Sequence, residues 1–522
     1  MTTRPDLPRI VTAAQMRAID ERAIAGMKIP SLSLMENAGR GVAARIRERL
    51  FDGDPLNRRV MIVCGRGNNG GDGFVVGRYL AEWGARVEFC LIGGAAQLKG
   101  DAKANHDRVT AQGLTVSEIG ESGPVPDFSG ADLLVDAIFG TGFRGPIAGI
   151  AAKVIAAMNA AGVRIVSIDT PSGLHSDSGG LDDSTIIAYD TMSLACSKRG
   201  HWLWPGRGHV GSLETIDIGI PAEAVEAEGI KLSLITEDFV RKHLPPRPED
   251  AHKGTFGKAV VVGGSAGMSG AVVLAANAAL RTGVGLAYAA CPLSLVDAVD
   301  TGSIETVVLG MPEVQKRRVL ARRALGEIAK HIEHVDAVAI GPGLGRHYET
   351  QELVRRLVAR RRRPTVLDAD GLNAFAKEPA LLGYPNEVPL IITPHVAEMA
   401  RLLQKPNEEI STDREGAARE AAAKFNCIAV MKGAPTFVAT PDGEAYLNPT
   451  GNSGMATGGM GDVLTGIIVS LLAQSVDPLR AALLGVYIHG MAGDFAAADV
   501  GERSLLAGDV VGAISDVLQF LE

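Results

Sequence analysis

A run of glycines near the end of the chain leads to a single carboxylate and then to an apolar helical stretch. Residues 452–462 read NSGMATGGMGD, and residues 463–468 continue as VLTGII. Glycines let main-chain N–H groups converge on an anion, and a helix start adds the positive end of its dipole. We expect this segment to hold a phosphate group, with Asp462 as the general base beside it. The alternative is an ordinary loop in which Asp462 caps the helix, because Asp is a favoured N-cap residue.

A second glycine-rich loop follows a predicted strand in the first half of the chain. Residues 65–73 read GRGNNGGDG and come directly after the apolar run 60–64. Loops at the carboxyl ends of parallel strands form the ligand crevice of open sheets. Asn68 and Asn69 add amide donors and carbonyl oxygens to such a loop. Asp72 is either an acid–base candidate or a helix-cap residue.

Two aspartates end neighbouring strands of the same predicted sheet. Asp136 precedes a glycine-rich turn at residues 140–146, and Asp169 leads into TPSG at residues 170–173. Each aspartate alone is also typical of a turn or cap. Together, oxygens from Asn69, Asp136 and Ser172 suit a hard cation. The low formal charge of this set favours a monovalent ion.

Further polar segments of the second half fall at predicted strand ends or helix starts. Lys432 could contact a phosphate as a point charge, and Glu398 could hold magnesium through water. His395 is either a ligand contact or a satisfied loop histidine. Ala271 could line the same cleft, or it could serve close packing between helix and sheet. The segments are GPGLG at 341–345, DADGLN at 368–373, TPHVAE at 393–398 and KGAPT at 432–436.

The elements that position these residues alternate between strand and helix. Alternation of this kind predicts an α/β fold with parallel sheets covered on both faces. Capping boxes are predicted at Thr12 with Gln15, and at Ser33 with Glu36. A change of pattern near residues 231–237 predicts two domains, residues 1–232 and residues 233–522. The strand-like runs are 60–64, 87–92, 133–139, 163–168, 259–264, 335–340, 365–367, 389–392 and 428–431.

Composition excludes several classes of function. Only 4% of the 522 residues are aromatic and the net charge is −8, which argues against base stacking and against binding to a phosphate backbone. Five cysteines without a CxxC pair argue against disulfides and a zinc site and favour a reducing cytoplasm. The amino terminus lacks an apolar signal core, and no run reaches the length of a membrane helix. We therefore expect neither nucleic acid nor membrane as a partner.

The chain resembles the family of bifunctional NAD(P)H-hydrate repair enzymes, in which an epimerase domain is fused to a nucleotide-dependent dehydratase domain. The resemblance spans almost the whole chain. It implies a Rossmann-like three-layer sandwich followed by a ribokinase-like α/β domain. Arg66 and Ser453 depart from it, since proline is usual at both positions. The motifs that carry the resemblance lie at residues 68–72, 136, 140–146, 169–173, 341–345, 393–398, 432–436 and 454–462.

The resemblance also implies which residues bind each ligand. Those for the hydrated nucleotide are Asn68, Asn69, Gly70, Gly71, Asp72, Gly140, Thr141, Gly142, Phe143, Arg144, Gly145, Pro146 and Asp169, then Ala271, Gly343, His395 and Asp462. Those for ADP or ATP are Lys432, Gly433, Ala434, Pro435, Thr436 and Gly461. Potassium would lie between Asn69, Asp136 and Ser172, in agreement with the oxygen set above.

The implied chemistry is phosphorylation of the hydroxyl group of the S hydrate, followed by loss of phosphate. ADP is the implied donor and ATP the alternative. The first domain would interconvert the R and S hydrates, with Asp169 as the first acid–base candidate and Asp72 as the second. The main alternative is a vitamin or sugar kinase with an accessory nucleotide-binding domain. A homo-oligomer is expected, as is common for such folds.

Overall fold

A computed structural model describes residues 5–522 of the chain. It divides into two compact units, residues 8–230 and residues 231–522, and the second unit also takes the described residues before Pro8. Leu7 is buried in the hydrophobic core of the second unit. The observed boundary lies two residues before the expected one because β10 (Leu232–Leu234) pairs with β21 (Ala445–Asn448) of the second unit's sheet.

The first unit contains a seven-stranded sheet in the order β4-β3-β2-β5-β6-β7-β9, and all of its pairings are parallel. Its strands are β2 (Arg59–Cys64), β3 (Arg86–Ile92), β4 (Val116–Ile119), β5 (Leu133–Ala137), β6 (Ile165–Ile168), β7 (Asp190–Leu194) and β9 (Ser212–Ile216). A short pair, β1 (Ile10–Val11) with β8 (Ser197–Lys198), lies outside this sheet.

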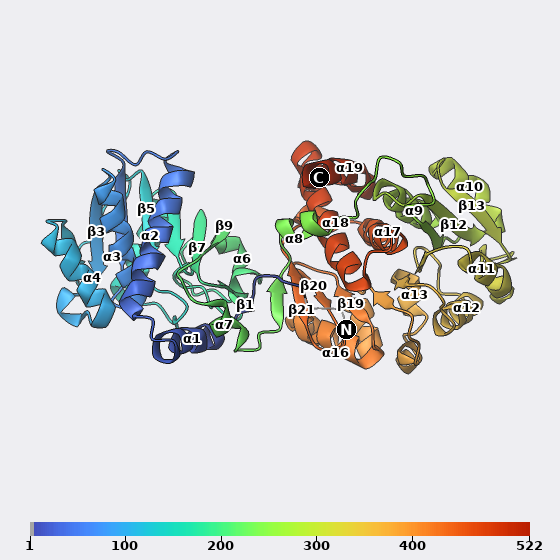
Figure 1. Ribbon diagram of the computed structural model, residues 1–522, viewed down its shortest axis with the longest axis horizontal. Coiled ribbons are helices and arrows are strands. Elements are labelled where there is room, and N and C mark those ends of the chain that lie inside the picture. Colours follow the sequence, from blue (N-terminus) through green and yellow to red (C-terminus); the bar gives the residue numbers. More distant parts are fainter. Residues whose placement is uncertain (1–4) are drawn as a thin grey trace. The chain divides into compact units, whose positions relative to one another are not determined.

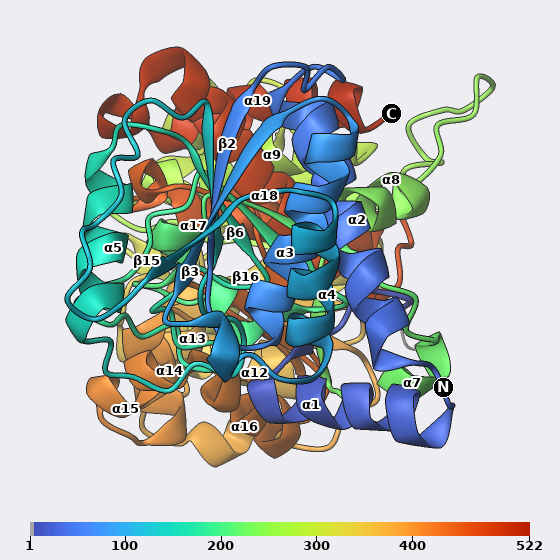
Figure 2. The same cartoon turned by 90° about the vertical axis from the view of Figure 1, so that its left-hand side faces the viewer.

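Helices cover both faces of that sheet. Figure 2 shows α2 (Ser31–Leu50), α3 (Asn68–Glu82) and α4 (Gly100–Ala111) on one side of the strands and α5 (Gly149–Ala160) on the other. Alternate residues of β2 enter separate cores. The even-numbered residues of 60–64 pack beneath α2, α3 and α4, and the odd-numbered ones pack beneath α5. The predicted three-layer sandwich is confirmed. The remaining helices are α1 (Ala13–Glu21), α6 (Arg207–Val210) and α7 (Ala222–Glu226).

The two predicted capping boxes have different outcomes. Thr12 and Gln15 cap α1 reciprocally, as predicted. The second prediction is wrong because α2 begins at Ser31, after its N-cap Pro30, so that Ser33 is the third residue inside the helix. Glu36 instead accepts two 2.6 Å hydrogen bonds from Arg78.

The second unit has a ten-stranded sheet in the order β10-β21-β20-β19-β18-β17-β16-β11-β12-β13. It is parallel except where β20 pairs with β19 and with β21 (Figure 1). The further strands are β11 (Lys258–Val262), β12 (Leu286–Pro292), β13 (Val307–Met311), β16 (Ala337–Ile340), β17 (Thr365–Leu367), β18 (Leu390–Ile392), β19 (Ile428–Met431) and β20 (Thr436–Ala439), and β14 (Glu313–Val314) pairs with β15 (Val319–Leu320) apart from this sheet.

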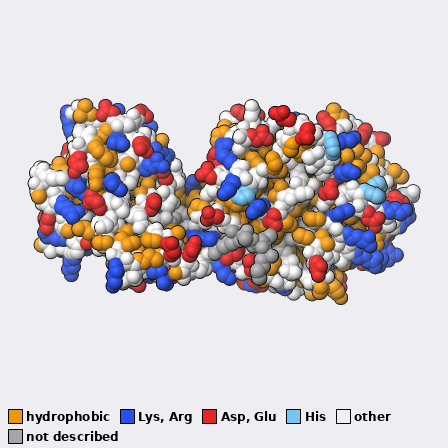
Figure 3. All heavy atoms as spheres, in the orientation of Figure 1, with side chains coloured by type: hydrophobic (Ala, Val, Ile, Leu, Met, Phe, Trp, Pro, Cys, Tyr) orange, Lys and Arg blue, Asp and Glu red, His pale blue; other side chains and the backbone are white. Residues whose placement is uncertain are grey.

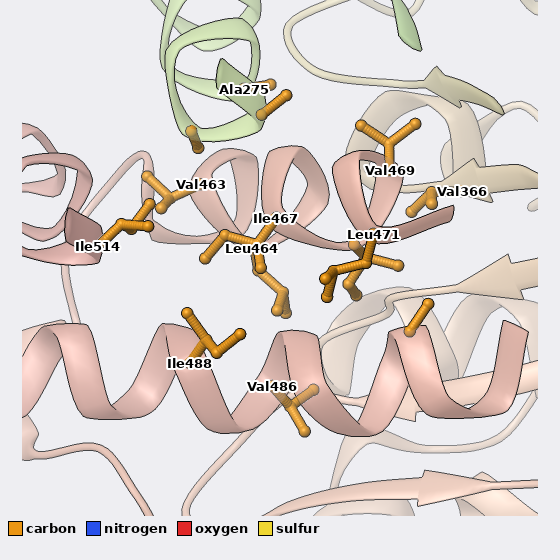
Figure 4. Close-up of a cluster of buried hydrophobic side chains, with 14 of the residues drawn as sticks. Ala275, Val366, Val463, Leu464, Ile467, Val469, Leu471, Val486, Ile488 and Ile514 are labelled. Carbon is orange, nitrogen blue, oxygen red and sulfur yellow. The ribbon is translucent and has the colours of Figure 1, made fainter. Parts of the chain in front are cut away.

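Helix α17 (Met460–Ala473) is the central helix of the second unit. Every residue from Val463 onward is buried, as expected for a helix that is apolar on all sides. Figure 4 shows its side chains between α9 (Ser269–Arg281) and α18 (Pro478–Val500). The other helices are α8 (Glu237–His243), α10 (Val296–Gly302), α11 (Leu325–Ile332), α12 (Tyr348–Ala359), α13 (Ala369–Asn373), α14 (Val396–Leu403), α15 (Asn407–Thr412), α16 (Arg414–Phe425) and α19 (Ala507–Leu521).

The expectation that no apolar run reaches the length of a membrane helix is wrong. Helix α18 has 23 residues and is apolar enough to cross a membrane by length and composition. Inside the second unit, however, 67% of its most apolar window is buried, and it packs against α17 and α19. Its hydropathy is that of a core helix.

On the face of the first unit visible in Figure 3, acidic and basic side chains are interspersed.

Candidate active sites

A cavity of about 1100 Å³ opens in the first unit. The predicted loops meet there, since Asn68, Asn69, Asp72 and Asp169 line it together with the 140–144 turn and Pro146. Gly70 supports the loop from behind: a Cβ on it would lie 2.0 Å from the carbonyl oxygen of Gly65. Gly71 and Gly145 are likewise absent from the cavity wall.

Asp169 is held in a fixed ion pair. Its backbone has a left-handed φ of 67°, and its carboxylate pairs with the fully buried Lys198 and accepts a 3.0 Å hydrogen bond from the Thr141 N–H. Burial alone would raise the pKa of Asp169, but Lys198 and Thr141 bring it to about 2. Asp169 is therefore an anion at neutral pH. No sequence pattern indicated Lys198, which lies 29 residues further along the chain.

Asp72 is not a helix cap. It is the fifth residue of α3, whose N-cap is Gly67, so this reading of the sequence was wrong. Its side chain is buried against the cavity, and burial raises its pKa well above the ordinary value. The neighbouring anions Asp169 and Asp20 raise it further.

Asp136 and Ser172 are in direct contact beneath the cavity. The fully buried Asp136 carboxylate accepts hydrogen bonds from Ser172 Oγ at 2.6 Å, Ser172 N at 2.9 Å and Ser167 Oγ at 2.8 Å. It forms no ion pair with any Lys or Arg among residues 5–522. Asn69 is near the 140–144 turn, since a Cβ on Gly140 would lie 3.3 Å from Asn69 Oδ1, and its buried Nδ2 lacks a partner. A buried carboxylate without a counter-cation, close to neutral oxygens, fits a monovalent cation.

In the second unit, Asp462 lies in the first turn of α17. The helix is capped by Gly459, which has a φ of 94°, and Asp462 is the third helical residue. The reading of Asp462 as the cap was therefore wrong. Burial raises the pKa of Asp462 to about 7, with a further contribution from the anion Asp368, and Lys432 opposes both.

The partly buried Lys432 and the buried Asp368 form an ion pair beside that helix start. Lys432 Nζ lies 2.7 Å from Asp368 Oδ1, and Thr465 Oγ1 donates to the other oxygen of Asp368 at 2.9 Å. A Cβ on Gly461 would lie 3.0 Å from Lys432 Nζ, so the ammonium group is against the first turn of α17. The sequence pointed to the segment that contains Asp368 but gave this residue no role.

The other predicted residues of this site fall into two groups. Ala271 and Gly343 meet where α9 begins, since a Cβ on Gly343 would lie 3.0 Å from that of Ala271. His395 and Glu398 form the capping box of α14, and the His395 N–H donates to Glu398 at 2.9 Å. His395 remains half exposed, whereas Glu398 is buried.

The loop 432–436 has a partner that the sequence did not indicate. Its Ala434–Pro435 bond is cis, and Thr436 Oγ1 donates to the Gly433 carbonyl at 3.0 Å. Arg414, at the start of α16, donates to the Ala434 carbonyl. The guanidinium group of Arg414 thus supports the back of this loop.

Both departures from the expected motifs have local partners. Arg66 Nη1 donates to Gln97 Oε1 at 2.8 Å, which ties the first glycine-rich loop to the segment after β3. Ser453 Oγ donates to the Glu502 carboxylate. Side-chain hydrogen bonds thus constrain the chain where proline is usual.

Comparisons with known proteins cover both units. Residues 31–200 match the model of the YjeF-related protein N-terminus, and residues 259–515 match that of NAD(P)H-hydrate dehydratase. Bifunctional NAD(P)H-hydrate repair enzymes named Nnr are similar along their length. That of Moorella thermoacetica is 43% identical over 517 residues, covering 98% of this chain and 97% of the relative. That of Thermofilum pendens is 37% identical, with the same shares covered.

A solved structure is similar to the second unit. It is the ADP/ATP-dependent NAD(P)H-hydrate dehydratase from Bacillus subtilis, co-crystallized with ATP and Mg²⁺, and it is 33% identical with a TM-score of 0.48. The similarity covers 55% of this chain and 98% of that one. The full-length matches, which include the first unit, favour the repair enzymes over the vitamin and sugar kinases. The chain belongs to the family of bifunctional NAD(P)H-hydrate repair enzymes.

Proposed function

We propose that the chain restores hydrated NADH and NADPH in two steps. The first unit interconverts the R and S hydrates, and the second removes water from the S hydrate with ADP or ATP as phosphoryl donor. The observation that carries the proposal is the 43% identity over 517 residues to a bifunctional repair enzyme. Both polar sites described above lie within the matched residues.

In the second unit, Asp462 acts as the general base. It removes the proton from the C6 hydroxyl group of the S hydrate while the oxygen attacks the terminal phosphoryl group of the nucleotide. Phosphate then leaves C6, a proton leaves C5, and the C5–C6 double bond of the dihydronicotinamide ring forms. The main-chain N–H groups of residues 458–461 stabilise charge on the transferred group. A pKa of about 7 suits this role, because Asp462 can accept and release a proton near neutral pH.

The loop 432–436 and Gly461 contact the nucleotide, and Ala271, Gly343, His395 and Asp462 contact the hydrate. Mg²⁺ would be held mainly by the nucleotide phosphates, with Glu398 acting through water, and would neutralise phosphate charge. Glu398 fits only such an indirect role, because its carboxylate already accepts from His395. ADP as the preferred donor remains a prediction.

In the first unit, Asn69, Asp136 and Ser172 would hold K⁺ and fix the 140–146 turn against the hydrate. The cation would supply the positive charge that the buried Asp136 lacks. Residues 68–72, residues 140–146 and Asp169 would bind the nucleotide part of the hydrate. A cytoplasmic location, small molecules as the only ligands and a homo-oligomeric assembly also remain predictions.

Replacing the proposed base tests this assignment. Asp462→Asn should lower the rate of dehydration by roughly 100- to 10,000-fold, the range of general base catalysis, while R and S hydrates still interconvert. Chiral chromatography of each hydrate with ADP, with ATP and without nucleotide would follow both reactions.

Asp516→Asn, an exposed change on α19, is the matched control and should leave both rates unaltered. Dehydration by Asp462→Asn at the wild-type rate would contradict the role of Asp462. A stable phosphoester as product would contradict the dehydratase.

A further inference from the structure

Two carboxyl groups in the first unit's cavity have no polar partner. Asp20, on α1, and Asp72, on α3, both line the cavity. Neither side chain makes a hydrogen bond or ion pair among residues 5–522. The Asp72 side chain is buried and that of Asp20 is partly buried. Buried carboxyl groups are normally hydrogen-bonded, so the unpartnered Asp72, with Asp20 in the same cavity, indicates that a ligand completes the site.

Helix α1 presents Asp20 to the cavity by its spacing. Ala13, Met16, Arg17, Asp20 and Glu21 of α1 line the wall. These positions recur every three or four residues, so they lie on one face of the helix. The buried Ile19 packs with Cys196 and Ile230 on another side of α1. In Figures 1 and 2, α1 lies at the end of the layers of the first unit and not on either face of the sheet.

The charged groups around this pair divide into fixed and free ones. Lys198 and Asp169 form an ion pair with each other and are the fixed groups. Burial raises the pKa of Asp20 to about 6. The ammonium of Lys198 opposes this rise, and the anions Asp169 and Glu21 add to it. For Asp72, burial is the largest cause of a raised pKa, and Asp169, Asp20 and Asp101 add to it. Two close carboxyl groups that share a site tend to hold one proton between them.

This inference rests on the proposed epimerase function. We propose that Asp20 and Asp72 are the acid–base pair of hydrate epimerisation, acting from the cavity on the C6 hydroxyl group and on the attacking water. Asp169, fixed by Lys198, is then the anion that stabilises positive charge on the ring and not the group that transfers protons.

The proposed step balances without any co-reactant. The protonated carboxyl donates to the C6 hydroxyl group, the C6–O bond breaks, and water leaves as the N1 lone pair forms an N1=C6 iminium ion. Water then adds to the opposite face of C6, and the ionised carboxylate takes its proton. One water leaves and one enters, and the two carboxyl groups have exchanged protonation states. The enzyme is then ready to catalyse the reverse reaction.

The test is Asp20→Asn in the full chain, with R-to-S exchange followed by chiral chromatography. We expect the rate to fall by roughly 100-fold or more, while dehydration of the S hydrate by the second unit continues at the wild-type rate. Asp20→Glu should recover part of the loss, because it restores an acid. Glu226→Gln removes an exposed carboxylate of α7 that does not line the cavity, and should retain the wild-type activity.

The pH profile distinguishes catalysis from a structural role. The wild-type rate should fall below about pH 6, where both carboxyl groups are protonated, and this limb should be absent from the residual activity of Asp20→Asn. Wild-type enzyme in H₂¹⁸O should also exchange ¹⁸O into the C6 hydroxyl group during epimerisation.

The outcomes separate the two proposals. Wild-type protein that cannot interconvert the hydrates overturns the epimerase function itself. An active wild type together with an Asp20→Asn variant of equal rate and unaltered pH profile overturns only the acid–base pair. Wild-type epimerisation without ¹⁸O exchange would also contradict it.

Discussion

Each of the two sites pairs a lysine with a buried aspartate, but the two lysines act in opposite ways. In the first unit, Lys198 contacts Asp169 directly and keeps the pKa of that carboxyl at about 2. In the second unit, Lys432 contacts Asp368, and the nearby Asp462 has a pKa of about 7. A lysine in direct contact fixes a carboxylate as an anion, whereas a lysine already paired with another acid leaves the next carboxyl group ready to titrate.

This difference separates binding from proton transfer. The fixed anion Asp169 can hold or stabilise a cationic ring but cannot donate a proton near neutral pH. The titratable Asp462 can act as a base there.

The largest effect is expected for Lys198→Met. This change leaves the carboxylate of Asp169 buried and uncompensated, which should lower the free energy of unfolding of the first unit by about 3–5 kcal/mol. Epimerisation should be lost with it. Denaturant unfolding would measure the change, with the exposed Lys153→Met on α5 as the matched control. A loss below about 1 kcal/mol would show that the pair does not fix Asp169.

Asp368→Asn should lower the rate of dehydration by at least roughly tenfold. Lys432 is then free to pair with Asp462, which makes Asp462 a weaker base. Loss of the Asp368 anion and release of Lys432 both lower the pKa of Asp462. The acid limb of the kcat profile should therefore move to lower pH. Lys432→Met should move this acid limb to higher pH. A shift of the limb in the same direction in both variants would contradict the opposing effects of Asp368 and Lys432 on the pKa of Asp462.

The wild-type pH dependence should also differ between the sites. Asp462 must be ionised to act as a base, so kcat for dehydration should rise with pH through about 7 and level off above it. Asp169, with a pKa of about 2, should add no limb above pH 4 to epimerisation. Steady-state rates of both reactions from pH 5 to 9 on one preparation would check this. A dehydration rate that is flat across pH 7 would exclude Asp462 as the titrating base.

The smallest effect is expected at Ser453. Ser453→Ala removes an exposed hydrogen bond to Glu502 and should cost less than about 1 kcal/mol. It should raise KM for the nucleotide only modestly, because the glycines that contact phosphate are unaltered. Thermal unfolding and initial rates would measure both. A large fall in kcat would mean that Ser453 positions the base.

Local pattern was enough to predict several elements and to misplace others. The capping box of Thr12 and Gln15 was predictable because both residues lie within one turn. The preference for Asp at caps also predicts that Asp72 and Asp462 cap their helices, but glycines at 67 and 459 take that position. The residue at which a helix begins depends on the preceding loop, and a preference for Asp at N-caps does not reveal it.

The alternation of strands and helices, the glycine-rich loops and the likeness to a family are all predictable from the order of residues, because they depend on neighbours within a few positions. Which charged groups meet is set by the folded arrangement of the chain. Lys198 reaches Asp169 across 29 residues, and Lys432 reaches Asp368 across 64. Asp20 belongs to the first helix, far in sequence from the loops that it faces. Such partners depend on the order of strands in the sheet and on the packing of helices at its ends, and hydrophobic periodicity carries no record of either.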